Sequence, residues 1–187
     1  AREGEPMSGA RQFPSQGAMP DLGLVNLSNV VATHLSQGVG AALAMRMQGS
    51  DALAAIYFGD GASSTGDCHE AMNFAAVHSL PVIFVCENNG YAISVPVRKQ
   101  MAVDGVASRA AGYGMLGVTV DGTDAAAVCE VTAAAAERAR SGEGPTLIEA
   151  MVERFKPHTG DDDHTRYRSD DELEAMQARD PVSILRT

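Results

Sequence analysis

Two short polar clusters carry the residue types from which proteins build a magnesium site. The first places Asp60 between Gly59 and Gly61, and the second is a pair of asparagines that ends with Asn89. A carboxylate oxygen and an amide oxygen are hard ligands of the kind that octahedral Mg²⁺ prefers. The free backbone N–H groups of Gly61 and Ala62 could bind the anionic oxygens of a diphosphate. Together the clusters predict a site for a metal-bound diphosphate.

The elements around the clusters are expected to bring them together. Apolar segments at 53–58 and 81–86 precede the two clusters and predict short buried strands, and residues 66–79 between them predict a helix. Such a βαβ unit with a right-handed crossover places the carboxyl ends of two parallel strands at one edge of a sheet. We therefore expect Asp60 and Asn89 to face the same point.

Each cluster also occurs in ordinary turns. Asp-Gly and Asn-Asn-Gly are common where a chain reverses direction, so either cluster alone favours turn chemistry over a metal site. The presence of both, each after a strand and separated by one crossover, favours the metal site.

The rest of the chain alternates helices and strands. We expect helices at 32–48, 104–113, 124–140 and 170–178, further strands at 116–120 and 146–152, a region that is largely loop at 1–28, and an active-site loop at 155–169. This order predicts a single α/β domain over residues 1–187. Its sheet is expected to be doubly wound, mostly parallel and flanked by helices.

The composition argues against several partners. A net charge of −10 repels phosphate backbones and anionic membranes, and no Lys/Arg cluster offsets it. The three cysteines are scattered and lack metal-type spacing, which indicates free thiols in a reducing compartment. No stretch of the sequence resembles a signal peptide or a membrane span. We therefore expect no nucleic-acid or membrane partner and a cytoplasmic location.

A glycine-containing segment at 38–40 offers a different function. It superficially suggests the phosphate loop of a Rossmann-type oxidoreductase, but no strand precedes it and the third glycine is missing. This function is therefore disfavoured.

Longer segments around both clusters agree with one enzyme family. These segments are 57–62, 70–76, 87–94, 112–114, 120–122 and 157–163, the last leading to Tyr167-Arg168. They resemble the alpha subunit of the decarboxylase component of 2-oxo acid dehydrogenase complexes, most of all the branched-chain (2-oxoisovalerate) type. The two clusters resemble the thiamine diphosphate motif, which begins with GDG and ends with NN. The resemblance covers nearly the whole chain and implies the thiamine diphosphate-binding fold.

The resemblance also implies roles for particular residues. Mg²⁺ would be held by Asp60, Asn89 and the backbone carbonyl of Tyr91, which leaves positions for diphosphate oxygens and a water. The full set that the resemblance places around the cofactor is Asn29, Val31, Gly59, Asp60, Gly61, Ala62, Asn89, Tyr91, Ile93 and His158.

The loop at 155–169 contributes the catalytic candidate. A lone loop histidine is more often solvated than functional, but His158 matches the family's histidine that contacts the cofactor diphosphate near the reacting centre. The acidic run at 161–163 could suggest a metal site. Three adjacent carboxylates cannot all face one ion, so a solvated loop is favoured, with Arg166 and Arg168 as expected partners of these acids.

In some relatives the segment with Ser28, Thr33 and His34 binds K⁺. His34 stands where those relatives carry glutamine, so the resemblance leaves K⁺ binding open.

The resemblance implies an active site shared with a second subunit. In this family the glutamate that engages the aminopyrimidine comes from a beta subunit, and the local candidates Glu70 and Glu87 are better explained as helix-face and loop residues. Relatives begin before Ala1 and continue past Thr187, so we expect a fragment or an unusually short form.

The expected activity follows from this resemblance. An alpha2beta2 heterotetramer would bind thiamine diphosphate and Mg²⁺, decarboxylate a branched-chain 2-oxo acid and transfer the acyl group to a lipoyl-bearing acyltransferase. Two alternatives remain open at this point: a non-catalytic interaction subunit of the same fold, and a member specific for pyruvate or acetoin.

Overall fold

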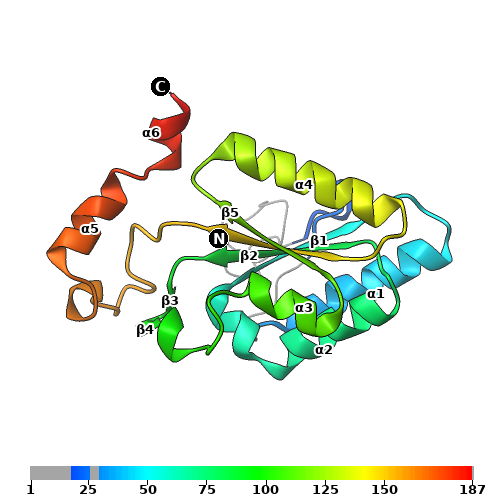
Figure 1. Cartoon of the computed structure of the whole chain (residues 1–187), viewed down its shortest axis with the longest axis horizontal. Helices are drawn as coiled ribbons and strands as arrows, with labels where there is room; N and C mark the ends of the chain where they lie inside the picture. Colours follow the sequence, from blue (N-terminus) through cyan, green and yellow to red (C-terminus); the bar gives the residue numbers. More distant parts are fainter. Residues whose placement is uncertain (1–17, 26–29, 187) are drawn as a thin grey trace, which may run out of the picture.

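The central feature of the fold is a parallel sheet of four strands. The computed structural model describes residues 18–25 and 30–186, and Figure 1 shows their arrangement. All three strand pairs are parallel, and the strand order is β1-β2-β6-β5. The strands are β1 (Ala54–Gly59), β2 (Val82–Asn88), β5 (Leu116–Asp121) and β6 (Thr146–Met151).

Helices cover both faces of this sheet. Helices α1 (Thr33–Met47), α2 (Gly66–Val77) and α3 (Ala110–Tyr113) lie on one side, and α4 (Ala125–Arg140) lies on the other (Figure 1). The predicted doubly wound, mostly parallel α/β sheet is therefore confirmed.

Strand β2 explains why its segment is apolar without alternation. Phe84 packs into the core beneath α1 and α2, whereas Ile83 and Val85 pack into the core beneath α4. A strand that is buried on both faces needs apolar residues at successive positions.

Side-chain caps fix where two of the helices begin. The Thr65 hydroxyl accepts a hydrogen bond from Cys68 N at 3.3 Å at the start of α2. At the start of α4, Asp124 accepts from Ala126 N at 2.9 Å and from Ala127 N at 3.0 Å. Each cap satisfies N–H groups that have no partner inside the helix.

Several short elements differ from the expectation. The expected helix at 104–113 is a 3-10 turn, η4 (Ala107–Arg109), that continues into α3. After β2 the chain forms a small hairpin of β3 (Tyr91–Ala92) and β4 (Val95–Pro96), followed by η3 (Val97–Lys99). Strands of two residues are too short to give a sequence period, which is why the pattern did not predict them.

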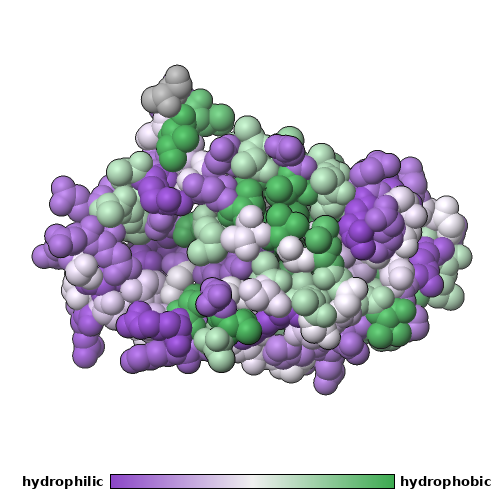
Figure 2. All heavy atoms as spheres, viewed as in Figure 1, coloured by the Kyte–Doolittle hydropathy of each residue, from purple (hydrophilic) through white to green (hydrophobic). Residues whose placement is uncertain are grey.

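The two ends of the described chain also carry short elements. Within 18–25 there is one 3-10 turn, η1 (Pro20–Leu22), and the rest of the predicted loop at 1–28 lies mainly outside the described residues. Beyond β6, the loop at 155–169 contains η5 (His164–Arg166) and leads to α5 (Asp170–Gln177) and α6 (Pro181–Leu185). In Figure 2 hydrophilic residues gather over the end of the molecule where α5 lies, whereas the projecting α6 exposes hydrophobic residues.

Within residues 18–25 and 30–186, none of the helices has the length and apolar character that a bilayer crossing requires.

Candidate functional site

The two polar clusters lie side by side at the carboxyl edge of the sheet. Asp60 begins the 3-10 helix η2 (Asp60–Ser64) directly after β1, and Asn89 directly follows β2. The strands end together, since Gly59 pairs in register with Glu87. The predicted βαβ unit therefore brings these neighbouring strand ends together.

A glycine permits the close approach of the two cluster loops. A Cβ atom added to Gly61 would lie 2.8 Å from the Cβ of Ala92, which is closer than such atoms approach in folded proteins. Ala92 belongs to β3, in the loop after the asparagines. Any larger residue at 61 would push the two loops apart.

Asp60 has the surroundings of a carboxylate prepared for a cation. It is 1% exposed, and its Oδ2 accepts a hydrogen bond from Gln100 Nε2 at 2.9 Å. Among the described residues, Oδ1 accepts no hydrogen bond. A buried carboxylate with one neutral donor is costly unless a positive charge compensates it. The site therefore fits a metal ion.

The two asparagines have different partners. Asn88 is buried; its Nδ2 donates to Glu149 Oε1 at 2.7 Å, and its Oδ1 accepts from Gly90 N at 2.9 Å. Asn89 is half-buried, and among the residues that the structure describes its Oδ1 accepts only from Tyr91 N, at 3.2 Å. Asn88 is therefore committed to holding the turn, whereas Asn89 keeps a lone pair on Oδ1 for a ligand.

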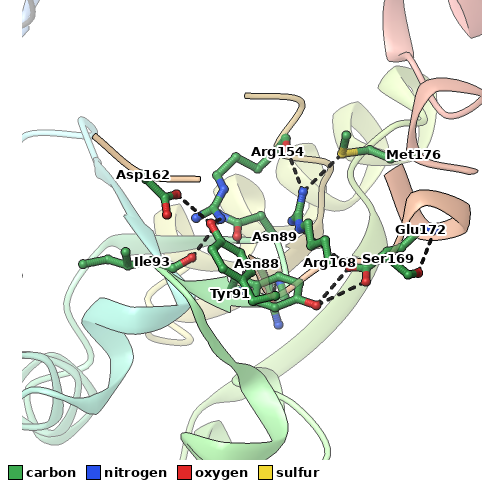
Figure 3. A network of polar contacts seen from close by, with 12 residues as sticks. Asn88, Asn89, Tyr91, Ile93, Arg154, Asp162, Arg168, Ser169, Glu172 and Met176 are labelled. Carbon is green, nitrogen blue, oxygen red and sulfur yellow. Dashed lines mark hydrogen bonds and ion pairs between the residues drawn. The ribbon is translucent and has the colours of Figure 1, made fainter. Parts of the chain in front are cut away.

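The Tyr91 ring lies beside Arg168, and its hydroxyl points toward Glu172 (Figure 3). The Arg168 guanidinium lies 4.6 Å from the ring centroid, and the Tyr91 hydroxyl donates to Glu172 Oε1 at 3.0 Å. Burial and the hydrogen bond to Glu172 raise the pKa of Tyr91 above its ordinary value. The ring anchors the hairpin, which agrees with a role for the Tyr91 main chain.

Ile93 links the hairpin to the loop at 155–169. Its backbone is in the left-handed region, with φ of 56°, and its carbonyl accepts a hydrogen bond from Arg154 Nη2 at 2.8 Å. The same nitrogen donates to the Tyr167 hydroxyl oxygen at 2.9 Å. Arg154 thus fixes the start of the loop against the segment that follows the asparagines.

Asp162 organises the loop from within. Its Oδ2 accepts from the Tyr167 hydroxyl at 2.6 Å and from His158 N at 2.8 Å. These hydrogen bonds, that of Tyr167 first, lower the pKa of Asp162. The backbone of His158 is therefore held by Asp162. His158 is exposed at the surface.

The expected pairing of Arg168 with the acidic run is wrong. Arg168 is 5% exposed, donates to Arg154 O at 2.9 Å and forms an ion pair with Glu172 at 3.6 Å. Its position over the Tyr91 ring turns it toward α5. A guanidinium gains more from a carbonyl, a carboxylate and a ring face at one place than from a solvated acid.

The remaining predicted residues lie near the start of α1. Val31 is 61% exposed just before this helix, while Asn29 and Ser28 lie outside the described residues. His34 Nε2 forms a hydrogen bond with Tyr57 O at 2.8 Å, and Thr33 Oγ1 donates to Val30 O at 3.0 Å. The His34 imidazole is thus committed to β1.

A cavity of about 540 Å³ borders the asparagine turn on the side away from Asp60. It is lined by Asn88–Gly90 and by the ends of β5 and β6. Arg179 closes part of it through ion pairs with Asp121 at 3.1 Å and Glu153 at 2.9 Å.

No cluster of three or more His, Cys, Asp or Glu side chains within the described parts of the chain could hold a metal ion. A site built from one carboxylate, one amide and one backbone carbonyl does not depend on such a cluster.

Sequence reasoning missed several residues that shape the site. They are Gln100, Glu149, Arg154, Tyr167 and Glu172. One of them carried a usable signal: Glu149 is the only charged residue in the otherwise apolar segment 146–152. A charge is rarely placed in a buried strand unless it is paired.

Comparisons with known proteins agree on one family. The dehydrogenase E1 component family matches residues 2–187. The chain is 50% identical over 182 residues to the 2-oxoisovalerate dehydrogenase subunit alpha of Bacillus subtilis, covering 97% of this chain and 55% of that protein. It is 45% identical to the 3-methyl-2-oxobutanoate dehydrogenase subunit alpha of Mycobacterium tuberculosis, covering 96% of this chain and 47% of that protein.

Two further matches are a relative named for another substrate and a solved structure that covers only part of the chain. A pyruvate dehydrogenase E1 component subunit alpha of Staphylococcus aureus is 47% identical over 154 residues, covering 82% of this chain and 42% of that protein. A crystal structure of a transketolase variant from Pichia stipitis matches with a TM-score of 0.55 and 25% identity, over 66% of this chain and 20% of that one. The chain spans about half the length of the curated relatives it matches. With a family match that covers nearly every residue, the chain belongs to the dehydrogenase E1 component family.

Proposed function

We propose that this chain acts as the alpha subunit of a thiamine diphosphate-dependent 2-oxo acid dehydrogenase. With a beta subunit, in an alpha2beta2 heterotetramer, it would decarboxylate a branched-chain 2-oxo acid and pass the acyl group to a lipoyl-bearing acyltransferase. The observation that carries the proposal is Asp60, a buried carboxylate with a free oxygen, beside Asn89 at the edge where β1 and β2 end. The 50% identity to a 2-oxoisovalerate dehydrogenase alpha subunit supports the substrate class.

Different residues would bind the metal and the diphosphate. Asp60, Asn89 and the Tyr91 carbonyl would hold Mg²⁺, a donor set of hard oxygens that suits this ion. The N–H groups of Gly61 and Ala62, at the start of η2, would bind diphosphate oxygens. Gly59, Val31, Ile93 and Asn29 complete the proposed cofactor contacts.

When bound, thiamine diphosphate supplies the nucleophile and the electron sink that decarboxylation needs. The exposed His158 would donate a hydrogen bond to the diphosphate or to the reacting group. The fixed backbone of His158 limits where its imidazole can reach, which favours a defined position near the reacting atoms.

A second subunit is needed for one carboxylate. Glu70 and Glu87 are both exposed, and the oxygens of Glu149 are occupied by donors from Asn88 and from the backbone of Val106 and Ala107. None of the three is free to engage an aminopyrimidine ring in a buried site. The proposal therefore assigns this role to a beta subunit.

The proposal places the protein in the cytoplasm. Cys68, Cys86 and Cys129 are free thiols, which agrees with a reducing compartment.

A calorimetric titration tests the proposed function directly. Thiamine diphosphate is titrated into this chain mixed with a beta subunit of the same family, with and without Mg²⁺, and turnover of a panel of 2-oxo acids is then measured. We expect binding only with Mg²⁺ and fastest turnover of branched-chain acids. Binding without turnover would favour a non-catalytic interaction subunit, and a preference for pyruvate, as the Staphylococcus aureus relative's name suggests, would favour a pyruvate-specific enzyme.

A further inference from the structure

A buried carboxylate lies in the middle of the sheet, on the strand next to the one that leads to the asparagine turn. Glu149 is 2% exposed and belongs to β6, where it pairs in register with Cys86 of β2 and Thr119 of β5. An acidic residue at such a place must be held by donors, because an unpaired buried charge would strongly destabilise the fold.

Four donors occupy the two oxygens of this carboxylate. Oε1 accepts from Asn88 Nδ2 at 2.7 Å and from Val106 N at 2.9 Å. Oε2 accepts from Ala107 N at 2.9 Å and from Thr119 Oγ1 at 3.5 Å. Glu149 thus joins the asparagine turn to the segment that precedes α3.

One branch of these contacts leads to Asn89. The Asn88 side chain, held by Glu149, accepts from Gly90 N at 2.9 Å. Gly90 adopts a φ of 83°, so the turn has a conformation that favours glycine. The orientation of Asn88 therefore determines how the backbone turns between Asn89 and Tyr91.

The other branch leads to Asp60. Glu149 fixes the far end of the loop at 100–107, and Gln100 lies at its near end. Gln100 Nε2 donates both to Asp60 Oδ2 at 2.9 Å and to Val95 O at 3.0 Å. A Cβ on Gly105 would lie 2.6 Å from Glu149 Oε2, so the loop passes directly over the carboxylate.

We propose that Glu149 is a positioning residue that sets the distance and orientation between the two metal-binding halves, Asp60 on one side and the turn of Asn89 and Tyr91 on the other. This inference rests on the proposed function of the site. Glu149 itself contacts neither metal nor cofactor and acts through Asn88 and the loop at 100–107.

Glu149→Gln tests the charge and the acceptor count at nearly constant volume. Whichever way the new amide is oriented, its NH₂ group faces N–H donors in place of an acceptor, so at least one of them loses its partner. Loss of such a residue behind a metal site lowers metal affinity by about 10- to 100-fold. We expect a loss of this size in the Mg²⁺-dependent affinity for thiamine diphosphate, measured on the chain with its beta subunit.

Thr146→Val is the matched control. Thr146 lies on the same strand, is also 2% exposed, and its hydroxyl has no hydrogen-bond partner among the described residues. The substitution is nearly isosteric and removes an unpaired polar group. We expect cofactor affinity in Thr146→Val to equal that of the wild type.

A second readout needs no cofactor. Amide hydrogen exchange is compared at Gly90 and Tyr91, in the asparagine turn, and at Gln100, in the loop beside Asp60. In Glu149→Gln we expect faster exchange at all three positions, and in Thr146→Val no change. Because this readout is taken on the cofactor-free protein, it tests the positioning role even if wild-type protein fails to bind thiamine diphosphate and the proposed function falls.

A charge exchange separates positioning from a general loss of packing. In the double variant Asn88→Asp with Glu149→Gln, the new glutamine amide donates to the new aspartate, which still accepts from Gly90 N. We expect amide exchange at Gly90 and Tyr91 in the double variant to return toward the wild-type rate. Asn88→Asp alone places two carboxylates together, so we expect it to exchange faster at these positions than the wild type or the double variant. A merely structural role predicts no such rescue.

Gly105→Ala keeps the experiment decisive if Glu149→Gln does not fold. The added methyl displaces the carboxylate without removing it and should give the same pattern with smaller amplitude. The proposal is overturned if the exchange rates at Gly90, Tyr91 and Gln100 in the folded variants match those of Thr146→Val.

Discussion

At the scale of single residues, the site depends on which polar atoms are already occupied. Asn88 uses both ends of its amide, whereas Asp60 and Asn89 each keep an acceptor that no described neighbour fully satisfies. A hard divalent cation binds where oxygen lone pairs are held in place but left unpaired. The hydrogen bonds already made by each side chain therefore support different proposed roles for two adjacent asparagines, Asn88 in holding the turn and Asn89 in binding the metal.

Asp60→Asn should abolish Mg²⁺-dependent cofactor binding and leave the fold nearly intact. The substitution keeps the volume of the side chain and the acceptor for Gln100, but it removes the anionic charge that a hard cation requires. We expect at least a tenfold loss of affinity in calorimetric titration.

Asp67→Asn is the control for this change. Asp67 is exposed in the first turn of α2, seven residues after Asp60, and has no proposed role in the site. Equal affinity losses in Asp60→Asn and Asp67→Asn would contradict the assignment of Asp60 as a ligand.

Substitutions of the two asparagines should change different quantities, cofactor affinity at Asn89 and stability at Asn88. Asn89→Leu removes a ligand oxygen and should lower Mg²⁺-dependent affinity with little change in the free energy of unfolding. Asn88→Ala leaves a buried donor–acceptor network incomplete and should reduce the free energy of unfolding by about 1–3 kcal/mol. Calorimetry and urea unfolding of both variants test the separation, and a loss of stability in Asn89→Leu equal to that in Asn88→Ala would show that the turn shape alone carries the effect.

At the scale of elements, backbone pairing holds the sheet side of the site, whereas side-chain hydrogen bonds hold the loop at 155–169. The strand ends are held by parallel pairing on a core that is buried on both faces. The loop is held mostly by side chains, and Asp162 accepts hydrogen bonds from both Tyr167 and His158 N. Order in the loop therefore depends on the charge of one half-buried carboxylate.

The pH dependence of the loop follows from the sign of this pKa shift. The pKa of Asp162 is lower when the loop is ordered, so the ordered loop is favoured above the unperturbed value, about 3.9. This contribution is lost as the pH falls through the lowered pKa. Tyr167→Phe removes the largest cause of the shift and should raise the pKa of Asp162 toward its ordinary value.

Carboxyl chemical shifts measured by NMR across pH 2 to 6 check this expectation. We expect the Asp162 titration to move to higher pH in Tyr167→Phe, and Asp180, whose pKa is lowered by Ser183 and Val182 N at a distant helix start, to titrate as in the wild type. An unchanged Asp162 titration would show that the hydrogen bond of Tyr167 does not hold the loop.

The sequence predicts the long elements well and the short ones poorly. Helices α1, α2 and α4 and all four strands of the parallel sheet have apolar patterns that extend over six or more residues, so their positions could be inferred to within a few residues. The anchoring of Tyr91 by Glu172 and the contact of Arg154 with Ile93 join residues that lie 81 and 61 positions apart in the chain. No local pattern encodes such pairs, which is why the predicted pairing of Arg168 was wrong.

Among the candidate ligands, proximity could be predicted but division of roles could not. The crossover between β1 and β2 places Asp60 and Asn89 at one edge for topological reasons. That Asn88 turns inward follows from Glu149, which lies 61 residues later in the chain. The roles of Val31, Ile93 and His158 in cofactor binding stay predictions.

At the scale of the whole molecule, the proposed cofactor site depends on a group that the proposal assigns to a second subunit. The proposed metal ligands lie at the carboxyl edge of the sheet, and the proposal assigns the carboxylate for the aminopyrimidine to a beta subunit. That residues 1–187 form a single domain stays a prediction as well.

Assembly should therefore be a condition for activity. We expect the chain alone to show no turnover of a 2-oxo acid and the mixture with a beta subunit to sediment as a heterotetramer with activity. Sedimentation and a decarboxylation assay on the same samples check this. Turnover by the chain alone would refute the shared site, because every essential group would then have to lie within these residues.

Strand β1 has one further consequence, for self-association. It ends the strand order, so among the described residues only β2 pairs with it, and its outer edge presents backbone N–H and C=O groups that another strand could join. The imidazole of His34 occupies one of these acceptors, the carbonyl of Tyr57. Tyr57 itself is 56% exposed. His34 thus keeps one backbone carbonyl of this edge strand from pairing with another strand. Its removal would make two copies of the chain more prone to pair through their β1 edges.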